Sequence, residues 1–527
     1  MKLFNIYTYT ILLFYLLVLN ENQSAFGLKN DRLKVNSKNI ESRMVSGAKF
    51  EQVMIQNIKI PSKDLNHVRM INVGIDGAIL DKVDMRDSVI IASDWNKSSL
   101  KGINLSGAKI QNSRFDFINM MDSDLNYVVL TGSEIRSSSL KNIKMKGSYI
   151  TDAVFASVDL STSDTSFSVF SMTFEGVNFK RADAHSSHIY NSSIFASDFT
   201  GANLSGVKFE KVVFGPQKNV NSNLRETNLS FSYMKMVDMI SMDLSGSYMR
   251  GITAENCNFS YCNLSNARLN DGFLVKTTFK GADLRYAEMK KTQARELQFS
   301  GTNMSSANFS NSDFERSVFD DAIMEKIKLD GATIKNSSMK KTNLSFASLA
   351  LANLEGSDLT GCAVKSVNMT KTGLNQIVLN SVRFENVNLT GAKLAGVSMR
   401  NSIWINVKFS GAVLTGCDMT DNSFKGCNFD GAVMTGVVLK GSSIEGSSLK
   451  GVSLRSADMR NTLCKKVVFD GSVFKEAVLK NAIFERSSVI QVDFTNADIK
   501  GANFTGTSMK KVRGFNKAIN ADKASGL

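Results

Sequence analysis

The chain repeats itself every five residues, and this period constrains its fold more than any other feature. Every fifth residue from Leu224 to Met509 is apolar, and all but Ala254, Ala294 and Cys464 are Leu, Ile, Val, Met, Phe or Trp. An α-helix repeats about every 3.6 residues and a strand about every 2 residues, so neither explains this spacing. The period predicts a chain that turns a corner once in every five residues.

We call each fifth residue the centre of a unit. The residue two before the centre is small, as at Ala202 and Ala502, the residue just before it is often Asp or Asn, and Gly is common two after it. Asx and Gly suit corners, because Asx side chains bond their own backbone and Gly accepts positive φ. Four units then close a square coil of 20 residues, and successive coils pair like parallel strands about 4.8 Å apart. The sequence therefore predicts an all-β solenoid stabilised by stacking of its turns.

The motif A-(D/N)-L-x-G, as in residues 201–205 and 501–505, closely resembles the repeat of the pentapeptide-repeat proteins. The resemblance covers roughly residues 48–510 and implies a right-handed quadrilateral β-helix of about 23 coils, roughly 110 Å long. It implies little about function, because the family is functionally diverse. Its best-known members act on DNA gyrase through a strongly acidic, DNA-like surface. The net charge of +14 makes gyrase an unlikely partner of this chain.

An earlier block of centres runs from Phe50 to Leu160 in a different phase, and Val45, Ile40 and Val35 continue it backwards. The phase slips by one residue somewhere in 161–173. We expect this slip to kink or break the rod near Asp164.

A second irregularity interrupts the later block. Gly215–Asn219 replaces one unit and places a polar residue, Asn219, at a centre. Because five residues are kept, the phase survives, and we expect a local bulge. Loops are where solenoids often carry function, although a mere defect of the repeat is the alternative.

The pattern of the first 27 residues indicates a signal peptide. Lys2 precedes an apolar stretch whose core, Ile11–Leu19, is shorter than the about 20 residues needed to cross a bilayer. Small residues at Ala25 and Gly27 favour cleavage after Gly27. We therefore expect an exported protein, periplasmic or extracellular, with an uncleaved N-terminal membrane anchor as the alternative.

These features divide the chain into six segments. They are a signal peptide (1–27), a polar N-terminal segment or cap (28–47), a solenoid in the first register (48–160), the register slip (161–173), a solenoid in the second register (174–510) and a basic C-terminal tail or cap (511–527).

Cysteine and histidine give weak signals of chemistry. Five of the six cysteines occupy the small inward position and Cys464 occupies a centre, so we interpret all six as free thiols in the core. His185 and His188 flank one corner at outward positions near Asp183, which is a weak hypothesis for a surface metal site or an active site. We predict no catalytic residue, no resident metal and no cofactor.

Residues 20 apart should stack on one face of the solenoid, so columns of charge can be recognised in the sequence. Residues 425–485 of one column alternate Lys and Glu, whereas a second column carries only positive charge apart from Thr420. Like charges about 5 Å apart repel, and stability alone gives no reason to align them. We interpret this second set, the basic column, as a candidate site for an anionic partner, with a solvated face as the alternative. Its charged members are Arg400, Lys440, Arg460, Lys480 and Lys500.

The sequence supports three hypotheses about function. The first is a non-enzymatic scaffold or protein-binding rod, which could also dimerise through the solenoid ends. The second is a binder of an anionic polymer (nucleic acid, lipopolysaccharide or cell-wall polymer) through the basic column. The third is an enzyme with its site at 215–219 or at the corner of His185 and His188. We expect no small-molecule substrate.

Overall fold

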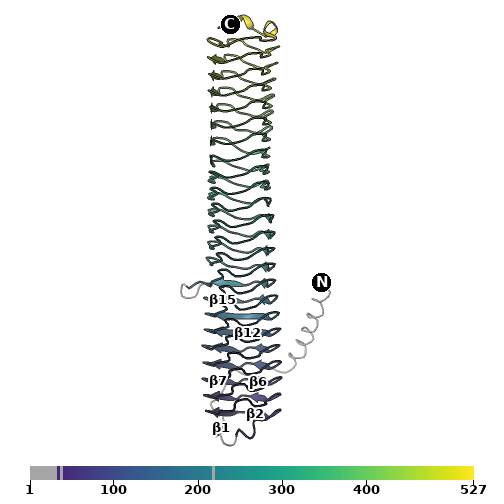
Figure 1. Ribbon diagram of the computed structural model, residues 1–527, viewed down its shortest axis with the longest axis vertical. Coiled ribbons are helices and arrows are strands. Elements are labelled where there is room, and N and C mark those ends of the chain that lie inside the picture. Colours follow the sequence, from purple (N-terminus) through teal and green to yellow (C-terminus); the bar gives the residue numbers. More distant parts are fainter. Residues whose placement is uncertain (1–32, 36–39, 216–219, 527) are drawn as a thin grey trace, which may run out of the picture.

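The computed structural model of the protein describes residues 33–35, 40–215 and 220–526. Its chain winds into one long rod, an all-β parallel solenoid of about 22 turns (Figure 1). This confirms the predicted fold class, with about one turn fewer than the spacing implied. The expected signal peptide, 1–27, and residues 216–219 of the expected bulge lie outside the described residues.

The strands are mostly three residues long, because each face of the coil is only one unit wide. In chain order they are β1 (Leu33–Val35), β2 (Lys49–Glu51), β3 (Val53–Gln56), β4 (Arg69–Ile71), β5 (Gly74–Asp76), β6 (Val89–Ile91), β7 (Asp94–Asn96), β8 (Lys109–Gln111), β9 (Arg114–Asp116), β10 (Val129–Thr131), β11 (Glu134–Arg136), β12 (Tyr149–Ala156), β13 (Val169–Glu175), β14 (His188–Tyr190), β15 (Ser193–Phe195), β16 (Lys208–Glu210), β17 (Val213–Gly215), β18 (Tyr233–Lys235), β19 (Thr253–Glu255), β20 (Phe273–Val275), β21 (Gln293–Arg295), β22 (Asp313–Glu315), β23 (Ala363–Lys365), β24 (Arg383–Glu385), β25 (Ile403–Ile405), β26 (Ser423–Lys425), β27 (Ser443–Glu445), β28 (Leu463–Lys465) and β29 (Ile483–Glu485). Two 3-10 turns follow, η1 (Phe515–Lys517) and η2 (Ala521–Lys523).

Backbone hydrogen bonds join each turn to its neighbours, as the unit 353–357 illustrates. Three of its five N–H groups donate to carbonyls of the turns above and below, at 2.8–3.1 Å. The N–H of Glu355 donates to Oδ1 of Asn353 at 3.1 Å. The N–H of Ser357 donates to the carbonyl of Leu354 at 3.0 Å and closes the corner. Every N–H of the unit is therefore bonded, and the Asx residue before the centre supplies one of the acceptors.

The corner residue, two after the centre, adopts a left-handed conformation in nearly every described unit of the rod. Gly201 has φ 66°, and non-glycine residues such as Lys341 (φ 55°) and Phe231 (φ 60°) take the same conformation. A side chain in this region costs roughly 1–2 kcal/mol. The hydrogen bonds to the neighbouring turns hold such corners, and this explains why Gly and Asn are frequent there without being required.

The centres form the core, as predicted. Every centre from Phe50 to Leu160 and from Leu224 to Phe504 is buried, with at most 6% of its surface exposed. Aromatic centres on successive turns also stack on one another. The ring centroid of Trp404 lies 4.1 Å from that of Phe384, with the two rings 2° from parallel. Burial of each large centre is worth about 1.5–3 kcal/mol, so a continuous column of side chains supports the whole rod.

At the N-terminal end, the prediction of one centre is wrong. Ile40 is buried, as predicted, but Val45 is 49% exposed and Met44 is buried in its place. The N–H of Met44 donates to the carbonyl of Ile40 at 3.0 Å, and this tight turn shortens the local spacing from five residues to four. Because β1 pairs in parallel with β3, the 20-residue register already exists before residue 48.

The register slip neither kinks nor breaks the sheet, contrary to the expectation from the sequence. It lies between Ser171 and Met172, within the predicted range 161–173 but after Asp164, and there the register between β12 and β13 changes from 20 to 19 residues. Buried and partly exposed residues alternate along β13, with Met172 buried between Phe170 and Phe174. The chain thus passes this position as one continuous strand without a corner. Buried side chains recur there every two residues instead of every five.

The segment around 215–219 enlarges one turn. Residues on either side of it pair 25 apart, as Lys208 with Tyr233, whereas later turns return to 20, as Tyr233 with Thr253. One whole unit is therefore added between two faces, and the phase of the repeat survives, as predicted. The added unit also explains in part why the turns are fewer than the span of residues implied.

Residues 511–526 form a cap on the last regular turns. Arg513, Ile519 and Ser525 form parallel bridges with residues 20 to 22 positions earlier. Phe515 covers the end of the core, with its ring centroid 5.9 Å from that of Phe494 and 6.4 Å from that of Phe504. The basic C-terminal segment is thus a cap, which ends the rod seen at the top of Figure 1.

Replacing Leu354 by Asp should lower the melting temperature sharply, because an unpaired charge inside the column costs several kcal/mol. The side chain of its neighbour Glu355 points outward and pairs with Lys335 at 2.8 Å. Glu355→Gln should therefore cost at most about 1 kcal/mol. Thermal unfolding followed by circular dichroism compares the two variants, and equal shifts would contradict the inward and outward assignment.

Candidate interaction surfaces

The basic column is stacked as its spacing predicts. The corner N–H groups of Gly441, Asn461 and Asn481 donate to the carbonyls of Arg460, Lys480 and Lys500 on the next turn, each at 3.0 Å. The five cationic side chains are exposed, and Thr420 is partly buried. These side chains therefore share one face of the C-terminal half of the rod.

A parallel column of aspartates neutralises most of this charge. Nε of Arg400 donates to Oδ2 of Asp418 at 2.6 Å, and an oxygen of Asp458 lies 2.6 Å from Arg460. The hydrogen bond from Arg460 lowers the pKa of Asp458 below its usual value. Lys480 pairs in the same way with Asp498, at 3.2 Å. The expectation that stability gives no reason to align these cations is therefore wrong, because their counter-ions stand beside them.

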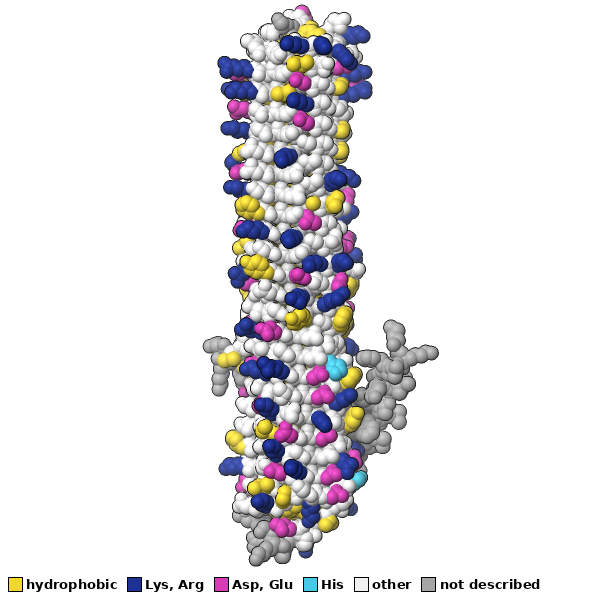
Figure 2. Space-filling view, in the orientation of Figure 1, with side chains coloured by type: hydrophobic (Ala, Val, Ile, Leu, Met, Phe, Trp, Pro, Cys, Tyr) yellow, Lys and Arg dark blue, Asp and Glu magenta, His cyan; other side chains and the backbone are white. Residues whose placement is uncertain are grey.

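Two members of the basic column lack such a partner. Among the described residues, neither Lys440 nor Lys500 has a carboxylate within ion-pair distance of its amine, and both are exposed. The column therefore offers two free cations rather than five. Elsewhere Lys and Arg are interspersed with Asp and Glu over the visible face of the rod (Figure 2).

The two histidines of the predicted corner do not converge on one site. Nδ1 of His185 lies 2.7 Å from Oδ1 of Asp183, whereas Nε2 of His188 lies 3.2 Å from Oε2 of Glu210. Burial lowers the pKa of His188, and nearby Lys208 lowers it further. Across the residues that the structure describes, no group of three His, Cys, Asp or Glu residues is arranged to hold a metal.

All six cysteines are buried in the core, where their spacing placed them. Sγ of Cys262 donates to the carbonyl of Met239 at 2.8 Å. Burial raises the pKa of Cys262 to about 12 and that of Cys257 to about 11, and it also raises the pKa of Cys464. These thiols are therefore protonated at neutral pH and have the properties of small core residues.

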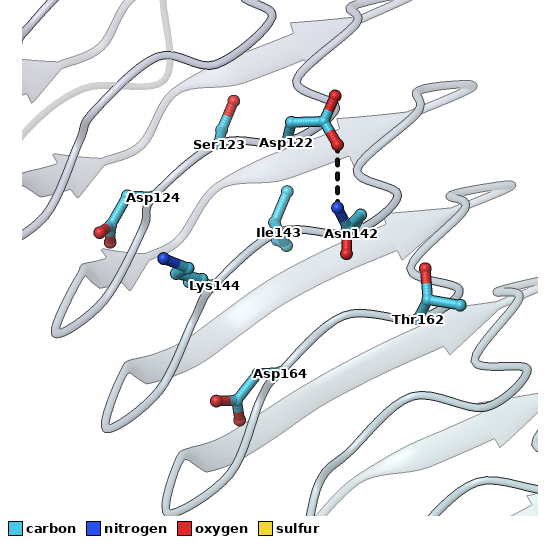
Figure 3. Close-up of a pocket in the computed structure, with 8 residues that line it drawn as sticks. All are labelled: Asp122, Ser123, Asp124, Asn142, Ile143, Lys144, Thr162 and Asp164. Carbon is cyan, nitrogen blue, oxygen red and sulfur yellow. Dashed lines mark hydrogen bonds between the residues drawn. The ribbon is translucent and has the colours of Figure 1, made fainter.

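A shallow hollow of about 340 Å³ lies on the N-terminal half of the rod (Figure 3). Nδ2 of Asn142 donates to Oδ1 of Asp122 at 2.9 Å across it. Asp124, Lys144 and Asp164 follow one another along a ladder on its other side. It has no aromatic wall and is open to solvent, and its carboxylates alternate with an amine, so its geometry does not define a ligand site.

Sequence reasoning missed a set of exposed aromatic side chains in the turns after residue 220. Phe231 is 68% exposed, and Tyr248 and Phe273 are each 45% exposed. Each occupies an outward position of the repeat, where polar residues are the rule. The sequence carries this signal as aromatic residues away from the centres, outside both the apolar pattern and the charged columns.

The family model for pentapeptide repeats matches the chain in eight copies. They cover residues 222–260, 262–296, 298–336, 328–363, 337–376, 383–421, 405–436 and 472–510. Together with the five-residue units and the parallel ladder, this match identifies the class of protein. The chain is a member of the pentapeptide-repeat family.

Solved structures of other proteins are similar to the chain over 37–92% of its length. QnrB1, a plasmid-mediated fluoroquinolone resistance protein, is 22% identical over 37% of this chain and 89% of its own, with a TM-score of 0.29. HetL, from the cyanobacterium Nostoc sp. strain PCC 7120 and involved in heterocyst differentiation regulation, is 18% identical over 48% of this chain and 90% of its own, with a TM-score of 0.19. The PL6 family alginate lyase AlyGC is 11% identical over 92% of this chain and 97% of its own, with a TM-score of 0.24. Sequence identities and TM-scores this low support no conclusion about function.

Curated proteins offer no match to the chain. In the part of the chain that the structure describes, no helix has the length and apolar character needed to cross a membrane.

The buried thiols predict a loss of stability at alkaline pH. Unfolded thiols ionise near pH 8.5, whereas burial raises the pKa of Cys257, Cys362, Cys417 and Cys427 to about 11. Their contribution is therefore complete below about pH 8 and is lost as pH rises towards 11. A variant with alanine at these four positions should show a smaller fall in melting temperature over this range. The same fall in both proteins would contradict the prediction.

Proposed function

We propose that the protein is an exported, non-enzymatic rod that binds a protein partner along its side. The proposal of export depends on the predicted signal peptide of residues 1–27. The proposal of binding without catalysis is supported by the open hollows and by histidines that pair separately with carboxylates.

A set of exposed apolar side chains along one face, interrupted by Thr253 and Glu255 of β19, carries the proposal. We call it the aromatic face, and it follows β18, β19 and β20. Its corner residues Phe231 and Met236 are 68% and 45% exposed, and Phe273 is 45% exposed two turns above Tyr233. Val275 lies beside Phe273 and is partly exposed. Aromatic residues and Met are enriched in the buried cores of protein interfaces, so this face suits a protein partner.

Hydrogen bonds hold the backbone of the aromatic face in place in the free protein. The N–H of Tyr233 donates to the carbonyl of Val207 at 3.0 Å, and that of Phe273 donates to the carbonyl of Ile252 at 2.8 Å. A surface held in this way loses little conformational freedom on binding. The same reasoning favours a scaffold, because one rigid rod holds several lateral faces at fixed distances.

The C-terminal end of the rod is less suited to a partner than its sides. The cap formed by residues 511–526 occupies carbonyl and N–H groups of the last regular turns, as in the bond from Phe504 N–H to the Ser525 carbonyl at 2.8 Å. Dimerisation through this end would have to displace the cap. We therefore propose lateral binding in preference to the end-to-end homodimer.

Replacing Phe231, Met236 and Phe273 together by Ser should abolish capture of the partner from the exported fraction, because it removes most of the exposed apolar area of the face. A matched control replaces Ile403, Leu463 and Ile483, which are 37–42% exposed on another face. Both variants should keep the β spectrum of the parent. Capture, identified by mass spectrometry, that survives the first set of substitutions would contradict the proposal.

An anionic polymer is the second candidate partner, and the unpaired amines of Lys440 and Lys500 are the observation that favours it. Each cation that contacts such a polymer releases counter-ions, so binding weakens as salt rises.

Replacing Lys440 and Lys500 by Glu should lower the salt concentration needed to elute the protein from heparin. Lys425 and Lys465 belong to the column that alternates with Glu445 and Glu485, so their replacement by Glu is a control with the same change of net charge. Equal shifts for the two variants would show that only net charge matters and would reject the basic column as a site.

A further inference from the structure

A second hollow lies on the face beside the aromatic face and has a volume of about 480 Å³. We call it the tyrosine–arginine groove. It spans four successive turns of the solenoid, because Asn228, Tyr248, Arg268 and Glu288 follow one another as partners in one parallel ladder. The residues that line it are Ser230, Tyr248, Arg250, Arg268, Asn270 and Glu288.

Arg268 is the free cation of this groove. Its guanidinium carbon lies 5.1 Å from the centroid of the Tyr248 ring. Within the described part of the chain, this guanidinium has no hydrogen bond or ion pair with another side chain, in contrast to Arg250, which pairs with Asp271 at 2.9 Å. Stacking on an aromatic ring orients the planar fork and leaves its N–H groups available. Such a fork is suited to two parallel hydrogen bonds with a carboxylate.

The acidic side of the groove is already neutralised. Nδ2 of Asn270 donates to one oxygen of Glu288 at 2.9 Å, and Nζ of Lys290 lies 3.3 Å from the other oxygen. The hydrogen bond from Asn270 lowers the pKa of Glu288, and the charges of Lys290 and Arg268 lower it further. Glu288 is therefore ionised and paired with Lys290. Arg268 interacts with Glu288 through space without forming an ion pair, so the groove keeps a net positive charge.

The rest of the groove suits a ligand with hydroxyl groups and flat apolar faces. Tyr248 is 45% exposed, and its hydroxyl makes no hydrogen bond with another described residue. Ser230, Arg250 and Asn270 add hydroxyl, guanidinium and amide groups along the same face. Sugar rings combine these two properties, because their C–H faces stack on aromatic rings while their hydroxyls bond to planar polar side chains.

The spacing of the turns favours a polymer over a single sugar. Successive turns lie about 4.8 Å apart, which is comparable with the advance of one sugar residue in an extended polysaccharide. A chain lying along the axis would therefore meet the side chains of a new turn at each sugar residue. We propose that the tyrosine–arginine groove binds an extended polysaccharide that carries carboxylate groups, with one carboxylate held by Arg268 and one ring stacked against Tyr248. This proposal goes beyond the protein partner of the aromatic face and does not depend on it.

Polygalacturonate, a linear polymer of carboxylated sugars, is the probe for the test. Isothermal titration or affinity electrophoresis of the purified protein should detect binding, and Arg268→Gln and Tyr248→Ala should each weaken it at least tenfold. Fully methyl-esterified polygalacturonate has the same rings without the charge and should bind at least tenfold more weakly than the acid.

Matched controls separate the groove from general effects of charge and folding. Arg285→Gln removes a cation that is paired with Asp283 at 2.7 Å, and Tyr127→Ala removes a tyrosine that is 62% exposed on a distant turn. Both should bind polygalacturonate like the parent. The proposal is overturned if the parent does not bind the acid polymer, if Arg268→Gln leaves binding unchanged, or if duplex DNA binds as tightly and is lost with the same substitution.

Discussion

Hydrogen bonds between the turns are the interaction on which the rest of this structure depends. A single unit such as residues 353–357 directs three of its five N–H groups to the turns above and below and bonds the other two within the unit. An isolated turn would leave those groups unpaired, so stability arises only from stacking. The same bonds hold side chains such as Lys341 and Phe231 in left-handed corners, and they carry each inward column from one turn to the next.

The core could be predicted from the sequence because its signal is repeated many times. A centre such as Leu354 has the same environment as the centres one turn away, so any single exception leaves the pattern intact. The failures occur where the period changes locally. Met44 replaces Val45 through a tight turn, and Met172 points inward because a straight strand replaces a corner. In both cases the local hydrogen bonds decide the spacing, and a rule of every fifth residue does not contain them.

The surface was less predictable, because sequence spacing gives the column of a side chain but not the direction in which it reaches. Arg400 and Arg460 belong to one column, yet one pairs with an aspartate 18 residues later and the other with an aspartate two residues earlier. The aromatic positions were visible in the sequence, but their exposure depends on their neighbours. A Cβ on Gly251 would lie 2.7 Å from the Phe231 ring, so this ring lies along the surface only because the corner above it is glycine.

The cap formed by residues 511–526 has a consequence for the solution behaviour of the protein. A stack of parallel strands with bare ends is a template for further strands, and the same geometry without a terminus is the architecture of cross-β fibrils. Here the bridges of Arg513, Ile519 and Ser525 and the ring of Phe515 cover the terminal ladder and core. The basic charge of the segment, from Lys511, Lys517 and Lys523, adds mutual repulsion between these ends. The cap thus gives a repetitive, fibril-like backbone a defined length and keeps it from growing into a filament at this end.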